Sequence, residues 1–296
     1  MKKLLLAVLP AALILAGCSG ADSSGTPTIV VTTNILGDIT SSIVGDQADV
    51  LVLMPPNSDP HSFEISAAEA ARVESADLLI ANGLGLEEGV AKTIDAARAN
   101  GTDILEVGPG VDPIDYVSGQ SSGAADPHIW TDPERMRTAV GLIKDAVTES
   151  LDSVDVEAAA QDYDAQLVEL DGRMQERFAP IVNRKLVTNH HVFGYLADRY
   201  DFEVIGAVIP SGTTLASPSA SDLSDLAGTV RDAGVPTIFV DSSQPDRLAQ
   251  VMASEAGVDV DVVKLFTESL GDENSDAPTY LDMMDFNSTA IAAGLR

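Results

Sequence analysis

Short runs of β-branched and other apolar residues alternate, from residue 28 onward, with stretches whose apolar residues recur every three or four positions. The runs predict buried strands, and the longer periodic stretches predict helices. Single strands alternating with helices are typical of an α/β fold with parallel sheets. Strands are expected at residues 29–32, 50–54, 78–81, 103–107, 185–188, 204–208, 237–240 and 260–265.

Helices are expected near residues 36–44, 67–75, 87–99, 155–178, 193–199, 220–233, 245–256 and 280–293, with one more beginning at Pro133. The stretch 155–178 would be about 36 Å long at 1.5 Å per residue. It separates four strands from four others. We therefore predict two lobes, each a mostly parallel β-sheet flanked by helices, joined by one long rigid helix. A long surface helix within one domain is the alternative.

The N-terminus has the pattern of a targeting segment. Two lysines precede an apolar run, residues 4–16, that is too short to remain as a membrane-spanning helix. The run ends in LAGC at Cys18, which resembles a bacterial lipobox, whose cysteine becomes lipidated. We expect a signal peptide at 1–17 and a lipidated tether at 18–27; an ordinary signal peptide with a chance cysteine is the alternative.

The remaining chain is expected to form an N-terminal lobe at 28–152, the linking helix at 153–182, and a C-terminal lobe at 183–296. The formal charge is −29, and it becomes 15 − 46 = −31 without the two lysines of the leader. Such a charge repels phosphate backbones, so we expect no nucleic-acid partner. Cys18 is the only cysteine. An internal disulfide and a cysteine-type zinc site are therefore excluded.

The chain contains four histidines, at positions 61, 128, 190 and 191. His61 and His128 each close an Asp-Pro-His tripeptide, and the other two form a pair. His61 follows the second expected strand and His190 follows the fifth. Because ligands of open α/β sheets bind beyond the carboxyl ends of the strands, both lie at the correct edge.

Two carboxylates occupy the same edge. Glu268 follows the last expected strand and Asp241 follows the strand before it. Imidazoles with one carboxylate suit Zn²⁺, and additional oxygen ligands would favour Mn²⁺. A metal site between the lobes is one hypothesis. Another is an extracytoplasmic zinc hydrolase in which Glu268 acts as general base, although no His-Glu-x-x-His helix is present.

Several motifs occur in a fixed order with the lipobox: DPHSFE at 59–64, NGLGLE at 82–87, DPHIWTDP at 126–133, HHVFGYL at 190–196, and FTESL at 266–270. With these motifs the chain resembles the zinc/manganese-binding lipoproteins of bacterial ABC importers, the cluster A-I solute-binding family. The resemblance extends from about residue 28 to the C-terminus.

The resemblance implies a non-enzymatic receptor that binds a metal between its lobes through His61, His128, His190 and Glu268. It further implies delivery of the metal, most simply Zn²⁺, to an ABC permease by a monomer that is lipid-anchored at the outer face of the cell membrane. Many members have aspartate as fourth ligand. Zinc members often carry a His/Asp-rich loop before the second ligand, and 117–125 has no histidine, so a manganese receptor is the alternative. The roles of His191 and Asp241, and any adhesive role, stay open.

Overall fold

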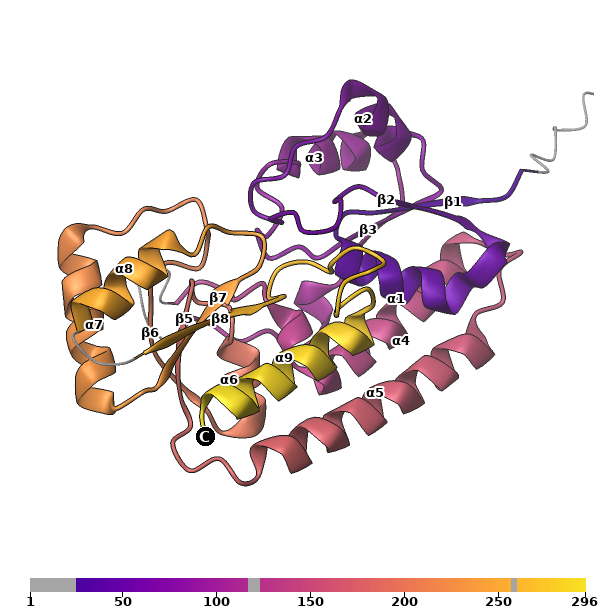
Figure 1. The fold of residues 1–296 in the computed structure, drawn as a ribbon. Coiled ribbons are helices and arrows are strands. Elements are labelled where there is room, and N and C mark those ends of the chain that lie inside the picture. The colour runs from indigo at the N-terminus through magenta and orange to yellow at the C-terminus, as the bar shows by residue number, and fades with distance from the viewer. Residues whose placement is uncertain (1–24, 117–122, 257–259) are drawn as a thin grey trace, which may run out of the picture.

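The computed structural model describes residues 25–116, 123–256 and 260–296 (Figure 1). Within these ranges, eight strands form two parallel sheets with the same strand order, β2-β1-β3-β4 and β6-β5-β7-β8. The predicted division of the strands into four and four is confirmed. The strands are β1 (Thr28–Val31), β2 (Asp49–Val52), β3 (Leu78–Ala81), β4 (Ile104–Glu106), β5 (Lys185–Thr188), β6 (Glu203–Ala207), β7 (Thr237–Asp241) and β8 (Asp261–Leu265).

Each predicted helix is present. The α-helices are α1 (Asn34–Val44), α2 (Ala67–Glu74), α3 (Ala91–Asn100), α4 (Pro133–Ser150), α5 (Glu157–Phe178), α6 (Gly194–Tyr200), α7 (Ala220–Ala233), α8 (Arg247–Ala256) and α9 (Tyr280–Gly294). Three short 3-10 turns were not predicted: η1 (Gly45–Gln47), η2 (Gly108–Gly110) and η3 (Ile129–Thr131).

The start of α3 shows why a helix boundary can differ from its prediction. The helix begins at Ala91 instead of residue 87. The carboxylate of Glu87 is buried and accepts hydrogen bonds from the backbone N–H groups of Asn82 and Gly83. Glu87 is therefore tied to the preceding loop, and the helix can begin only after it.

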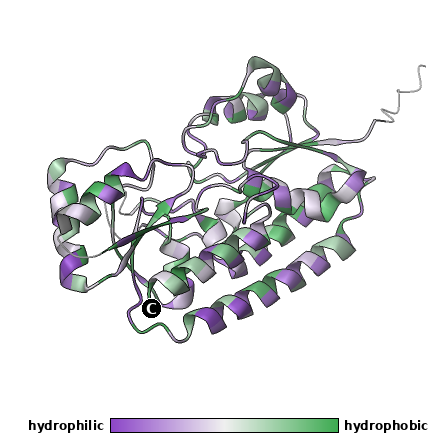
Figure 2. Ribbon diagram, in the orientation of Figure 1, coloured by the Kyte–Doolittle hydropathy of each residue, from purple (hydrophilic) through white to green (hydrophobic). Residues whose placement is uncertain are grey.

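Helix α5 connects the two sheets along the chain and runs beneath both (Figure 1). It packs against α1, α4 and α9. Hydrophobic and hydrophilic residues alternate around it (Figure 2). The residues that face its neighbours are buried: Ala160, Tyr163, Leu167, Leu170, Asp171, Met174 and Phe178.

The largest apolar cluster among the described residues extends across both halves. It includes Ile29 of the first sheet, Leu186 of the second, and side chains of α1, α4, α5, α6 and α9. Two smaller clusters lie on the other faces of the sheets, under α2 and α3 and under α7 and α8. The two sheets are therefore held together by a common core as well as by α5. None of the helices in the described ranges has the length and hydropathy to cross a membrane.

Candidate metal centre

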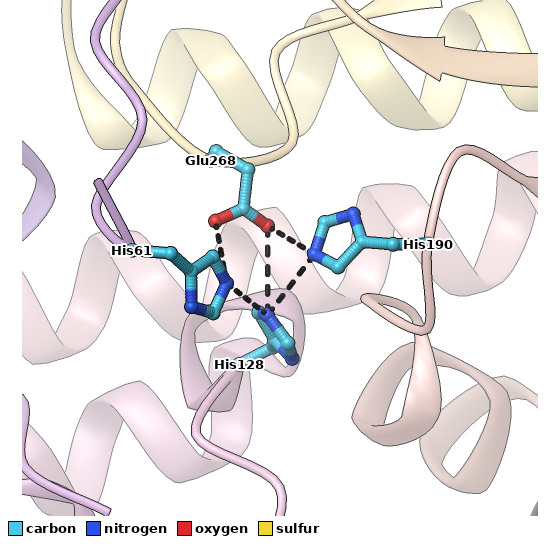
Figure 3. A group of neighbouring side chains, drawn as sticks. All are labelled: His61, His128, His190 and Glu268. Atoms are coloured by element: carbon cyan, nitrogen blue, oxygen red, sulfur yellow. Dashed lines mark hydrogen bonds and ion pairs between the residues drawn. The ribbon is translucent and has the colours of Figure 1, made fainter. Parts of the chain in front are cut away.

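Four buried side chains from both halves of the chain converge in one place (Figure 3). His61 comes from the loop after β2, and His128 immediately precedes η3. His190 and Glu268 lie two and three residues beyond the ends of β5 and β8. The carboxyl ends of the strands thus position three of the four, as expected for a parallel sheet.

The distances between the side chains are short enough for one ion. The Nε2 atom of His128 lies 3.4 Å from Nε2 of His61 and 3.3 Å from Nε2 of His190. A carboxylate oxygen of Glu268 lies 3.1 Å from Nε2 of His190, and the other lies 3.7 Å from Nε2 of His61. One donor atom from each of the four residues lies within 4.8 Å of every other.

Burial controls the charge of the imidazoles. His61, His128 and His190 are at most 2% exposed. Burial, together with the neighbouring imidazoles, lowers the pKa of His61 to about 2. Burial likewise holds the pKa of His128 well below its ordinary value. Both rings are therefore neutral near pH 7, which is the form that coordinates a metal.

His190 and Glu268 shift each other's pKa. Burial raises the pKa of Glu268 to about 7, while the adjacent His190 opposes that rise. For His190 burial is the largest influence and lowers the pKa, but the contact with Glu268 and the negative charges of Asp241 and Asp59 together outweigh it, so the pKa is raised. A bound cation would favour the deprotonated form of both groups.

Several polar atoms of the cluster lack a hydrogen-bond partner among the described residues. Among the atoms that face the centre they are both carboxylate oxygens of Glu268. Buried polar groups are normally paired, and a buried carboxylate with two unpaired oxygens beside three imidazole Nε2 atoms is explained by a bound cation. Three imidazoles and a carboxylate are ligands that suit Zn²⁺. The residues therefore fit a divalent transition metal.

Asp126 orients the ring of His128. Its Oδ1 atom lies 2.7 Å from Nδ1 of His128 and accepts a hydrogen bond from the backbone N–H of the same residue. This contact places the ring proton on Nδ1 and leaves the Nε2 lone pair facing the cluster. The hydroxyl of Tyr195 donates to the backbone oxygen of Asp126. A Cβ atom on Gly194 would lie 2.4 Å from Oδ2 of Asp126, so glycine leaves room for this carboxylate.

Asp241 holds in place the loop that carries Glu268. It is the last residue of β7, and its Oδ2 atom accepts hydrogen bonds from the backbone N–H groups of Thr267 and Glu268. The Thr267 hydroxyl also donates to this oxygen, at 2.5 Å. Asp241 thus fixes the loop that carries Glu268 without being one of the four converging residues.

The two adjacent histidines point to different places. His191 lies outside the group of donors that the described residues bring together. Its side chain instead lines a separate cavity of about 590 Å³, which it shares with Asp126 and Tyr116. Its backbone N–H donates to the carbonyl of Ser211.

The sequence indicated the four converging residues and Asp241, whereas the supporting contacts of Asp126 and Tyr116 were not predicted. The contact made by the aspartate of each Asp-Pro-His tripeptide could have been predicted from the motif, because an aspartate two residues before a histidine can reach the backbone N–H of that histidine. Asp59 and Asp126 both make this contact, at 2.9 Å. Tyr116, whose hydroxyl lies 3.3 Å from Nδ1 of His128, had no such signal in the sequence.

Comparison with known proteins identifies the family. A family model described as zinc-uptake complex component A, periplasmic, matches residues 29–294. The chain is 28% identical to the manganese-binding lipoprotein MntA of Halalkalibacterium halodurans, over 97% of this chain and 96% of that protein. It is 30% identical to the manganese ABC transporter substrate-binding lipoprotein PsaA of Streptococcus anginosus, over 100% and 99% of the two chains.

The structural comparison agrees. The periplasmic zinc-binding protein TroA of Treponema pallidum superposes with a TM-score of 0.83 at 26% identity, covering 92% of this chain and 99% of that one. A manganese-bound periplasmic metal-binding protein of Candidatus Liberibacter asiaticus gives a TM-score of 0.80 at 28% identity, covering 91% and 100%. Proteins of this family are receptors and not enzymes, which removes the hydrolase alternative. The chain belongs to the zinc-uptake component A family, the metal-binding substrate-binding proteins of ABC importers.

Proposed function

We propose that this chain is the extracytoplasmic receptor that captures Zn²⁺ through His61, His128, His190 and Glu268 and delivers it to an ABC permease. The observation that carries the choice of metal is the spacing of the imidazole nitrogens, 3.3 and 3.4 Å. A tetrahedral zinc with Zn–N bonds of 2.0–2.1 Å places two ligand nitrogens about 3.3–3.4 Å apart. Four protein ligands fill this shell and leave no position for an activated water.

Manganese is the second candidate, and two observations favour it. MntA and PsaA, which the chain resembles over nearly their full lengths, carry manganese in their names. Both oxygens of Glu268 lack a hydrogen-bond partner among the described residues. If both oxygens bind, the site would have five ligand atoms, and the added oxygen favours Mn²⁺.

We further propose that the receptor works as a lipid-anchored monomer at the outer face of the cell membrane, with its lobes at 28–152 and 183–296 joined through 153–182. Cys18, the expected lipidation site, lies outside the described residues. The lipobox and the lipoprotein names of the relatives support the anchor. Fractionation of cells that express Cys18→Ala is expected to find the protein released from the membrane; retention would contradict the anchor.

Elemental analysis of the protein purified from its native host tests the metal. We expect one equivalent of zinc, and competition titrations are expected to show that Zn²⁺ displaces Mn²⁺. Stoichiometric manganese in the native protein, retained in the presence of equimolar Zn²⁺, would instead establish the second candidate. A protein that binds neither ion would disprove the receptor function.

A further inference from the structure

Three consecutive residues after β6, 212–214, form a strap that contacts the first half of the chain. Each makes a hydrogen bond with a different side chain of that half: Tyr116 hydroxyl to Gly212 carbonyl at 3.0 Å, Thr213 hydroxyl to Glu88 carboxylate at 2.9 Å, and Thr214 hydroxyl to Asp59 Oδ2 at 2.5 Å. These hydrogen bonds join the second half of the chain to the first.

Each of the three anchoring side chains also stands beside a proposed ligand. Asp59 accepts a hydrogen bond from the backbone N–H of His61 through its other oxygen, at 2.9 Å. Glu88 lies 3.9 Å from Nδ1 of His61. The hydroxyl of Tyr116 lies 3.3 Å from Nδ1 of His128. The strap is therefore attached at the rim of the metal centre and not at a remote surface.

Gly212 allows the strap to lie close to the side chain of Tyr116. A Cβ atom at this position would lie 2.2–2.6 Å from atoms of the Tyr116 ring and hydroxyl, so a side chain there would push the strap away. On its other side the strap continues from Ser211, whose carbonyl accepts the backbone N–H of His191. The strap thus spans from the segment that follows His190 to the loops that carry His61 and His128.

The four proposed ligands are at most 2% exposed, so a bound ion cannot leave unless some part of the structure moves. The apolar core beneath them is shared by both halves and resists separation. Residues 212–214, by contrast, lie outside this core, and Thr213 and Thr214 are only partly buried. Segments with few buried apolar contacts open most readily.

We propose that residues 212–214 close the metal centre, and that the hydrogen bonds from Thr213 to Glu88 and from Thr214 to Asp59 set the rate at which the ion leaves. This inference rests on the proposed function. A hydrogen bond to a carboxylate is about twice as strong as a neutral one, so its loss is expected to change a rate measurably. Gln244, in the loop after β7, also donates to Asp59 and is expected to reduce the change in release rate when the Thr214 hydrogen bond is lost.

Stopped-flow release of Zn²⁺ to an excess of a chromogenic chelator tests the strap. The variant Thr213→Val with Thr214→Val keeps the side-chain shape and removes both hydroxyl donors. We expect release about tenfold faster, which corresponds to about 1.4 kcal/mol in the barrier, with the association rate and the melting temperature of the metal-free protein unchanged. Thr213→Ser with Thr214→Ser restores the hydroxyls and is expected to restore slow release.

Ser62→Ala is the matched control, because the Ser62 hydroxyl donates to the same Asp59 oxygen from within the first half. We expect it to release Zn²⁺ within about twofold of wild type. Release from the valine variant at the wild-type rate, or equally fast release from Ser62→Ala, would overturn the strap while leaving the receptor function intact. Failure of the wild-type protein to bind Zn²⁺ would overturn the proposed function itself.

Discussion

His190 and His191 are adjacent in the sequence, yet the structure separates their side chains. His190 faces His128 and Glu268 in the buried cluster, and His191 lines the cavity beside it. Substituting His190 and His191 one at a time therefore tests the proposed ligand set, because the two substituted positions are adjacent in the sequence.

His190→Ala is expected to weaken metal binding by more than about 100-fold, because it removes one of four ligands, whereas loss of a supporting group alone costs about 10–100-fold. His191→Ala is expected to bind with nearly wild-type affinity. Isothermal titration with Zn²⁺ measures both. Equal losses in the two variants would mean that the ligand set is wrong.

Asp126 acts on the metal through His128, so its charge matters as well as its shape. Asp126→Asn preserves the size of the side chain but replaces a carboxylate by a neutral amide at 2.7 Å from Nδ1. We expect affinity to fall about 10–100-fold. Asp115→Asn, which makes the same charge change at an exposed position of the adjoining cavity, is the control and is expected to have little effect. A similar loss in both would indicate general electrostatics instead of orientation of the ring.

Helix α5 has two faces with different roles. Leu170 is fully buried in the core that both halves share, and Val168, two residues earlier, is 49% exposed. A helix that served only as an exposed linker would contribute little to stability on either face. The burial of Leu170 shows instead that α5 is part of the core.

Leu170→Ala is expected to lower the free energy of unfolding by about 2–5 kcal/mol, because it removes buried methyl groups and leaves a cavity. Val168→Ala, on the exposed face, is expected to change it by no more than about 0.5 kcal/mol. Urea denaturation followed by circular dichroism compares the two. Similar small effects would contradict the packing of α5 in the common core.

The proposed ligands come from both halves of the molecule, so a bound ion would hold the halves together. Metal at 100 times its dissociation constant stabilises the folded state by about 2.7 kcal/mol. We expect Zn²⁺ to raise the melting temperature and a chelator to reverse the rise. His190→Ala should show no such shift; a rise of the same size in this variant would locate the stabilising ion elsewhere.

Much of this protein could be predicted from the sequence. The strands, the helices and the length of α5 follow from local signals, since apolar periodicity reports burial. His61, His190 and Glu268 follow strands whose ends share one edge, whereas the full set with His128 was implied by the resemblance to the importer lipoproteins. Helix capping is similarly local: Asp132 caps α4 just before Pro133, which begins the helix as expected. Four histidines in a long chain, two of them in repeated tripeptides, were a further local signal.

The tertiary structure alone decided the contacts made between distant segments. The separation of His190 from His191, the support of Glu268 by Asp241, and the strap that joins Thr214 to Asp59 depend on how loops from separate strands meet. Such contacts leave no periodicity in the sequence, because each depends on where a single side chain lies once the loops have packed. The sequence thus specified the elements and the chemical nature of the site, and the packing of the two halves specified which side chains hold it in place.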